Sequence, residues 1–256
     1  MCLILLAYRV HPRYPLILAA NRDEFYHRPT IPAAFWETEP RLLAGRDLKS
    51  GGTWLGISRT GKIAALSNFR DPGRVRENTP SRGGLVTDFL LGGLPPADYL
   101  KMLQQRSQDY NGFNIIFGDR KNLFTYSNRG NVPPLLPPGI HGLSNHLLDT
   151  PWPKVTLGKK ALAEILARGK QPAVEEIFAL LADRSLPDDS LLPDTGVGLE
   201  TERLLAPLFI SGPTYGTRSS TILLISHDET VTFFERTYNG TPGSGSTRSF
   251  HFTIEE

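Results

Sequence analysis

Residues 1–25 read MCLILLAYRVHPRYPLILAANRDEF. Two nearly continuous apolar runs, Leu3 to Tyr8 and Leu16 to Ala20, are separated by a turn that contains Pro12 and Pro15. Short runs without polar alternation are typical of strands that are covered on both faces. The segment therefore predicts a buried β-hairpin at the start of the chain.

Cys2 is the only cysteine and lies directly behind Met1. If Met1 is removed, Cys2 carries both a thiol and a free α-amine, which titrates near pH 8 and can take the thiol proton. This is the arrangement of an N-terminal nucleophile. Alternatively, Cys2 is a small buried hydrophobe, as lone cysteines in apolar runs often are. A single cysteine also excludes an internal disulfide framework, so we expect a reducing, cytoplasmic location.

Basic and acidic residues nearly balance, at 28 and 26. The densest basic stretch, Arg70 to Arg82, contains acidic residues as well, so we expect no nucleic-acid partner. No apolar stretch approaches the roughly 20 residues of a membrane span, so we expect no spanning segment. The six histidines show no metal-ligand spacing, so we expect no metal site. The sequence carries no signal for the oligomeric state.

Beyond the first hairpin, strands are expected near both ends of the chain and helices in its middle. We expect strands at 53–58, 62–67, 113–117, 122–126, 221–226, 230–236 and 250–254, and helices starting at Ser81, Pro95, Thr150 and Val174. The stretch from Gly240 to Thr247 is expected to be a flexible connector. This order indicates an α+β fold with antiparallel sheets. Because no repeat or long linker interrupts it, we expect residues 1–256 to form a single domain.

Polar side chains follow several of the expected strands directly. Asn21 to Glu24 come after the strand that ends at Ala20, and Asn68, Asn145 and Arg218 lie at other expected strand ends. An amide in such a place can donate to an oxyanion, and an arginine can hold a carboxylate. Each is alternatively part of a capped turn or of a surface ion pair.

The glycine-rich stretch from Gly51 to Gly56 is similar to a phosphate loop only superficially, because it lacks the Lys-Ser/Thr pair and the following helix. We interpret it as a tight turn that leads into a strand. Trp54 then packs in the core or lines a pocket.

Taken together, these segments resemble the NRDE-motif family, the homologues of transport and Golgi organisation protein 2. Eukaryotic members of this family are associated with haem trafficking and lipid homeostasis. The matching segments follow the family's order along nearly the whole chain: Met1-Cys2, Asn21-Arg22-Asp23-Glu24, Arg28-Pro29, and residues 51–56, 81–83, 112–114, 143–145, 148–154 and 218–221.

The family is in turn distantly similar to the N-terminal-nucleophile hydrolases of the bile-salt-hydrolase and penicillin-acylase type. That resemblance implies a four-layer αββα sandwich of two antiparallel sheets. It implies that Cys2 is the nucleophile and that Asp23 contacts its amine. It also implies that Asn68 and Asn145 form the oxyanion site and that Arg218 is the late arginine of these enzymes.

One arginine of those hydrolases, shortly before the aspartate, has no match in register, because Ala20 stands there. Arg22 lies one residue before Asp23 and is the candidate substitute. Alternatively, the function of that arginine is lost.

Two functions of different classes follow from these residues. The first is an amidase or acylase that cleaves a linear carbon–nitrogen bond of a small acyl-amide substrate and requires no cofactor. The second is a carrier for haem or a lipid on the same scaffold without catalysis, with Trp54, Phe69 and Trp152 as candidate pocket residues. A structural adaptor is a third function, which the polar strand ends disfavour. Cys2 discriminates between enzyme and carrier, because only the enzyme needs the thiol.

Overall fold

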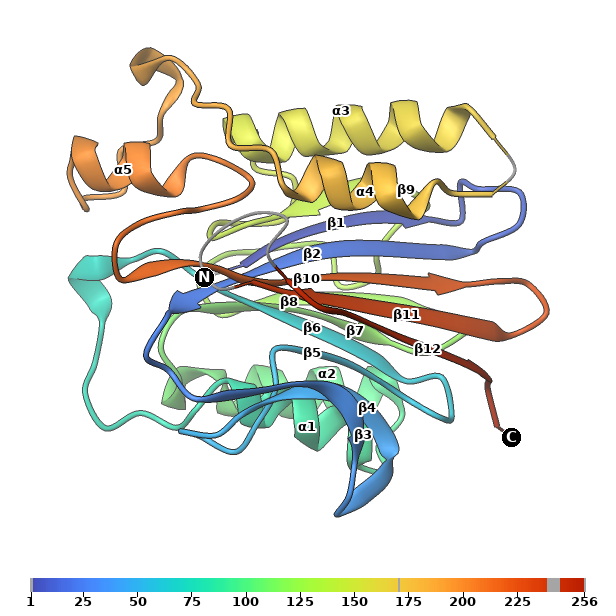
Figure 1. Cartoon of the computed structure of the whole chain (residues 1–256). Coiled ribbons are helices and arrows are strands. Elements are labelled where there is room, and N and C mark those ends of the chain that lie inside the picture. The colour runs from blue at the N-terminus through green and yellow to red at the C-terminus, as the bar shows by residue number, and fades with distance from the viewer. Residues whose placement is uncertain (1, 170, 239–244, 256) are drawn as a thin grey trace. The chain divides into compact units, whose positions relative to one another are not determined.

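The computed structural model describes residues 2–169, 171–238 and 245–255, and the backbone alone for Cys2. The chain divides into two compact units, each with its own sheet and helices (Figure 1). Unit 1 comprises Met1–His27, Pro137–Ser144 and Leu148–Phe252, and unit 2 comprises Arg28–Leu136, Asn145–Leu147 and Thr253–Glu256. The predicted α+β class with antiparallel sheets is confirmed. The single domain and the stacking into four layers stay predictions.

Unit 1 contains a six-stranded sheet in the order β12-β11-β10-β2-β1-β9. Strand β2 lies between β1 and β10 and is antiparallel to both. The strands are β1 Cys2–Tyr8, β2 Leu16–Phe25, β9 Gly139–Leu143, β10 Tyr215–Ile225, β11 Thr230–Thr237 and β12 Thr247–Thr253. The first hairpin is therefore confirmed, and it forms the middle of the sheet rather than an edge.

Two helices of unit 1, α3 (Pro153–Ala167) and α4 (Val174–Leu181), cover one face of this sheet (Figure 1). Alternate residues of β1 and β2 pack with them in one apolar cluster, which includes Leu5, Ile17 and Phe178. This alternation follows from strand geometry, in which successive side chains point to opposite faces of the sheet. The short helix α5 (Leu199–Leu205) completes the unit.

Unit 2 contains the second six-stranded sheet, in the order β3-β4-β5-β6-β7-β8, with every neighbouring pair antiparallel. The strands are β3 Thr30–Trp36, β4 Glu39–Asp47, β5 Leu55–Ser58, β6 Ile63–Asn68, β7 Phe113–Gly118 and β8 Leu123–Ser127. Helices α1 (Gly83–Leu91) and α2 (Pro96–Arg106) pack on it through a cluster of aromatic rings, in which Phe89, Tyr99 and Phe117 contact one another.

Several sequence predictions differ from the structure. Strands β3, β4 and β9 and helix α5 were not predicted. Strand β3 contains a proline and lies at the edge of its sheet, where the missing N–H costs no ladder bond. Ser81 does not cap α1, which begins at Gly83 after Arg82 without a side-chain cap. Helix α3 begins at Pro153 rather than at Thr150. Most of the predicted connector from Gly240 to Thr247 lies outside the described residues.

Candidate functional site

The four polar residues from Asn21 to Glu24 do not form a turn. They belong to β2, which continues to Phe25, and the first three are buried. Neighbouring strands supply their surroundings, because Arg22 pairs with Cys2 of β1 and Asp23 pairs with Thr217 of β10. The motif is therefore an internal part of a central strand, and each buried polar group needs a partner there.

Asn21 has its amide fully occupied. Its Nδ2 donates to the carbonyl oxygens of Leu181 and Leu208, both at 2.8 Å, and its Oδ1 accepts from the Ser220 hydroxyl at 2.5 Å. Both amide hydrogens are thus used within the protein. Asn21 ties the end of α4 and the segment around Leu208 to the sheet, and it has no hydrogen left for a ligand.

Asp23 is a buried carboxylate next to the amino end of β1, one residue beyond the Cys2–Arg22 pair. The Thr217 hydroxyl donates to its Oδ1 at 2.7 Å. Burial raises the pKa of Asp23, while the charge of Lys154, the hydrogen bond from Thr217 and the charge of Arg22 act in the opposite direction. A carboxylate in this environment is suited to hold a cationic or strongly donating group.

Lys154 is a buried residue of this region that the sequence pattern does not indicate. It lies in the first turn of α3, is 3% exposed, and donates from Nζ to the Leu205 carbonyl at 2.8 Å. Buried lysines are rare because desolvation of the ammonium is costly, so a nearby carboxylate such as Asp23 stabilises it. Lys154 belongs to segment 148–154, which resembles the NRDE-motif family. Its position next to the apolar Val155 gives no local signal that it is buried.

The two predicted arginines lie on neighbouring strands of unit 1. Arg22 is buried in β2, opposite Cys2 in register. Arg218 lies inside β10, where a β-bulge falls between Thr217 and Ser219, and not at a strand end as expected. Its Nη1 donates to the Phe25 carbonyl at 2.8 Å. The side chain of Cys2, the predicted nucleophile, lies outside the described residues, so its role stays a prediction.

Unit 2 brings the two predicted asparagines together. Asn68 is the last residue of β6, as expected, and Asn145 lies in the loop after β9. The Asn145 Nδ2 donates to the Asn68 carbonyl at 2.9 Å, and the Arg70 N–H donates to the Asn145 carbonyl at 2.7 Å. Asn145 therefore holds the backbone of Asn68. Within the described residues, the half-buried side-chain amide of Asn68 has no hydrogen-bond partner, so it remains available as a donor.

The glycine-rich stretch is a turn that leads into β5, as predicted. Gly51 has a φ of +77°, in the left-handed region. A Cβ on Gly52 would lie 2.5 Å from the carbonyl carbon of Gly83, so only glycine allows this backbone to approach the start of α1. The stretch serves packing within unit 2, and its resemblance to a phosphate loop has no further structural support.

A second polar cluster in unit 1 surrounds His141 of β9. Its Nδ1 lies 2.7 Å from Asp149 Oδ2, and its Nε2 lies 2.9 Å from the Pro137 carbonyl. Both partners accept hydrogen bonds, so both contacts are satisfied when both ring nitrogens carry a proton, which favours the imidazolium form. The hydrogen bond with Asp149 is the main reason that the pKa of His141 is raised. Burial raises the pKa of Asp149, but its bonds with His141, Lys159 and the Gly142 N–H lower it to about 2.

This cluster predicts a pH-dependent stability. Because the folded-state pKa of His141 is raised, its contribution is complete below the unfolded pKa near 6.5 and is lost as the pH rises through the folded value. We expect the free energy of unfolding of the wild type, measured with urea, to fall by about 1 kcal/mol more than that of His141→Gln between pH 6 and 9. His227→Gln, a change at an exposed histidine, should behave as the wild type. Parallel pH curves for wild type and His141→Gln would contradict the assignment.

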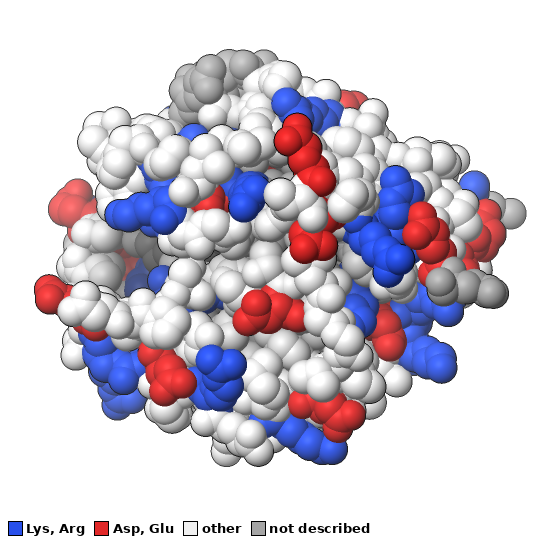
Figure 2. Space-filling view, turned by 90° about the horizontal axis from the view of Figure 1, so that it is seen from below, with Lys and Arg blue, Asp and Glu red and all other residues white. Residues whose placement is uncertain are grey.

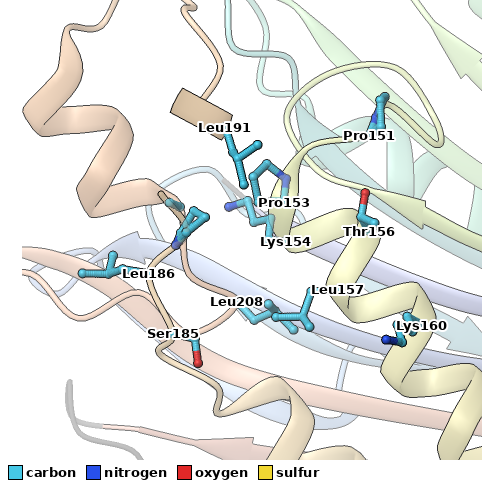
Figure 3. Close-up of a pocket in the computed structure, with 12 residues that line it drawn as sticks. Pro151, Pro153, Lys154, Thr156, Leu157, Lys160, Ser185, Leu186, Leu191 and Leu208 are labelled. Atoms are coloured by element: carbon cyan, nitrogen blue, oxygen red, sulfur yellow. The ribbon is translucent and has the colours of Figure 1, made fainter. Parts of the chain in front are cut away.

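A cavity of about 470 Å³ lies in unit 1 between the start of α3 and the segment from Ser185 to Leu208 (Figure 3). Leucines and prolines form most of its wall, including Leu157, Leu191 and Leu208. None of its twelve lining residues is acidic or aromatic, and two are lysines, Lys154 and Lys160. Because Lys154 already bonds to the Leu205 carbonyl, the apolar wall is the main feature, and the cavity is suited to an aliphatic ligand.

The surface shows no single charge sign on the face in Figure 2, where basic and acidic side chains are interspersed. Among the described residues, no three His, Cys, Asp or Glu side chains are arranged to hold a metal ion. None of the described helices has both the length and the apolar character that crossing a bilayer requires. That the protein has no nucleic-acid partner, and that hydrolysis requires no cofactor, both stay predictions.

The comparisons with known proteins cover most or all of the chain. The sequence matches the family described as Transport and Golgi organisation 2 over residues 1–240. Transport and Golgi organization protein 2 homologs of Bos taurus and Homo sapiens are 39% and 38% identical, over 100% of both chains in each case. A solved N-acylethanolamine-hydrolyzing acid amidase ortholog from Caenorhabditis elegans superposes with a TM-score of 0.51 at 12% identity, covering 87% of this chain and 92% of that one. At this identity the likeness concerns the fold alone.

Proposed function

The chain belongs to the Transport and Golgi organisation 2 family, and from this premise we propose that it is an N-terminal-cysteine amidase that cleaves a linear carbon–nitrogen amide bond. The observation that carries the proposal is the buried carboxylate of Asp23 next to the amino end of β1. The fold likeness to an amidase supports it by analogy, since a fold alone does not establish a reaction.

In the proposed reaction, removal of Met1 gives Cys2 a free α-amine. The amine takes the thiol proton, and the sulfur attacks the carbonyl carbon of the amide. The tetrahedral intermediate collapses to a thioester when the leaving amine departs with the proton from the α-ammonium. Water, deprotonated by the same amine, then attacks the thioester, which releases the carboxylic acid and restores the thiol. Asp23 accepts a hydrogen bond from the α-amino group throughout and fixes its position.

The oxyanion of the tetrahedral intermediate requires a donor, and Asn68 is the better candidate of the two asparagines. Its side-chain amide has no partner among the described residues, whereas the Asn145 amide is bonded to the Asn68 carbonyl. The resemblance to N-terminal-nucleophile hydrolases implies an asparagine donor, and within this proposal we assign that role to Asn68, with Asn145 as the support of its backbone. One such donor contributes about 3 kcal/mol in well-studied hydrolases. Arg22 and Arg218 are assigned to the electrostatic surroundings of the amine and of Asp23.

The test uses purified protein in which intact mass and N-terminal sequencing show that Cys2 is the first residue. The panel comprises N-acylethanolamines, N-acyl amino acids and primary amides of short and long acids, and mass spectrometry follows acid and amine release. We expect release of both products from at least one class. A protein with a free Cys2 that cleaves none of these classes contradicts the proposal.

A second candidate function is binding of a lipid without catalysis, and the cavity beside α3 favours it. Its aliphatic wall fits a single acyl chain (Figure 3). The lining has no His, Cys, Met or Tyr as an axial ligand of iron, so this cavity favours a lipid over haem. Native mass spectrometry for a co-purifying lipid and a spectral titration with haemin distinguish the two ligands. Absence of both ligands removes this candidate.

A further inference from the structure

Thr217 stands at the centre of a hydrogen-bond arrangement around Asp23. It is fully buried, and its Oγ1 accepts from the Ile210 N–H at 2.9 Å and donates to Asp23 Oδ1 at 2.7 Å. The Thr217 N–H in turn donates to the Ile210 carbonyl at 2.9 Å. Because a hydroxyl has only one hydrogen, the Ile210 N–H forces that hydrogen toward the carboxylate.

The backbone around Thr217 supports this geometry. The β-bulge between Thr217 and Ser219 interrupts the regular pairing of β10 with β2, and bulges of this kind re-aim a side chain. The preceding residue is Gly216, where a Cβ would lie 2.2 Å from the Tyr26 hydroxyl oxygen and 2.6 Å from the Ile210 carbonyl oxygen. Only glycine at position 216 therefore allows the segment around Ile210 to lie against β10 beside Thr217.

We propose that Thr217 is a positioning residue of the amidase site, whose hydroxyl, oriented by Ile210, fixes the rotation of the Asp23 carboxylate. The proposal rests on the proposed function, in which that carboxylate holds the α-amine of Cys2. A carboxylate that rotates freely would place its acceptor oxygens over a range of directions, and small misplacements of reacting groups are costly. Thr217 itself does not touch the substrate.

The proposal can be tested through the pKa of Asp23, which depends on the charged and polar groups around it. Lys154 faces it from α3, Arg22 from β2 and Tyr26 from the end of β2, while Thr217 contributes a hydroxyl from β10. Burial raises the pKa of Asp23, and the Thr217 hydrogen bond is one of the groups that lower it. Removal of this hydroxyl should therefore raise the pKa further.

The experiment is a titration of the Asp23 side-chain carbon by NMR in protein with ¹³C-labelled aspartate, with the resonance assigned from Asp23→Asn. We expect Thr217→Val to raise the Asp23 pKa by about 1, a tenfold change in the protonation equilibrium. Thr217→Ser keeps the hydroxyl and should restore the wild-type value. Thr221→Val is the matched control, because Thr221 is equally buried on the same strand but pairs with Ala20. Thr217→Ala replaces the valine variant if the latter does not fold.

Three results would overturn the proposal. They are an unchanged Asp23 pKa in both the valine and the alanine variant, a serine variant that titrates like the valine variant, and an equal shift in Thr221→Val.

The rate at which iodoacetamide alkylates Cys2, the only cysteine, is measured across the same pH range. If Cys2 reacts as an ordinary thiol in every variant, the proposed function fails. The Asp23 titration still decides whether Thr217 positions that carboxylate.

Discussion

Replacing Cys2 by alanine is expected to reduce amide hydrolysis by about 10⁴-fold or more, since loss of a covalent nucleophile removes the reaction path itself. Cys2→Ser should retain a small fraction of the activity, because a hydroxyl is a weaker nucleophile at neutral pH. The measurement is kcat/KM on the best substrate of the panel. Thermal unfolding of each variant controls for folding, and Cys2→Ala activity within tenfold of the wild type contradicts the assignment.

A companion variant separates the thiol from the amine. Insertion of a lysine between Met1 and Cys2 keeps the sulfur but moves the free amine to another residue. Since the proposed base is the α-amine of Cys2 itself, we expect this variant to be as inactive as Cys2→Ala. A protein that only binds a ligand in the cavity beside α3 would bind it equally well in all three variants. Full activity of the insertion variant would show that another group is the base.

The second large effect is expected at Asn21. Asn21→Leu leaves the Leu181 and Leu208 carbonyls and the Ser220 hydroxyl without their buried partner. Because each unsatisfied buried group costs about 1–3 kcal/mol, we expect the free energy of unfolding to fall by about 4 kcal/mol. Asn21→Asp should be at least as harmful, since it places carboxylate oxygen against two carbonyls.

Urea unfolding at pH 7 measures both Asn21 variants. Asn131→Leu serves as the control, because Asn131 is exposed, and its change should stay within about 0.5 kcal/mol. A loss of less than 1 kcal/mol for Asn21→Leu would mean that the segment around Leu208 is held to the sheet by other contacts.

The sequence was sufficient to predict those elements whose apolar pattern is local. The hairpin of β1 and β2, the pair β5 and β6, and helix α4 are confirmed. Strand β2 extends through Asp23 because distant residues satisfy its polar groups. Leu181, Leu208 and Thr217 lie 160, 187 and 194 residues from their partners in the chain. The local sequence pattern gives no information about such distant partners. Polar residues after an apolar run therefore predict the end of a strand, although here the strand continues.

The roles of the site residues came from resemblance rather than from spacing, and they stay predictions. Asp23 is buried beside the amino end of β1, Asn68 ends β6, and Asn145 lies beside Asn68 and donates to its backbone. Lys154 was missed, because a buried lysine in the first turn of a helix looks in sequence like any solvated one. Thr217 was missed for the same reason, since its importance comes from Ile210 and Asp23 together.

The place of β2 between β1 and β10 has a consequence for biosynthesis. The hairpin leaves the ribosome before β10, because Thr217 of β10 lies 194 residues after Asp23 of β2. At ~5–20 residues per second the nascent edge waits roughly 10–40 s for its partner. An uncovered apolar edge invites pairing with other chains. A nonsense mutation before Tyr215 should therefore yield a product that aggregates or is degraded, even though every residue of the NRDE segment has been translated.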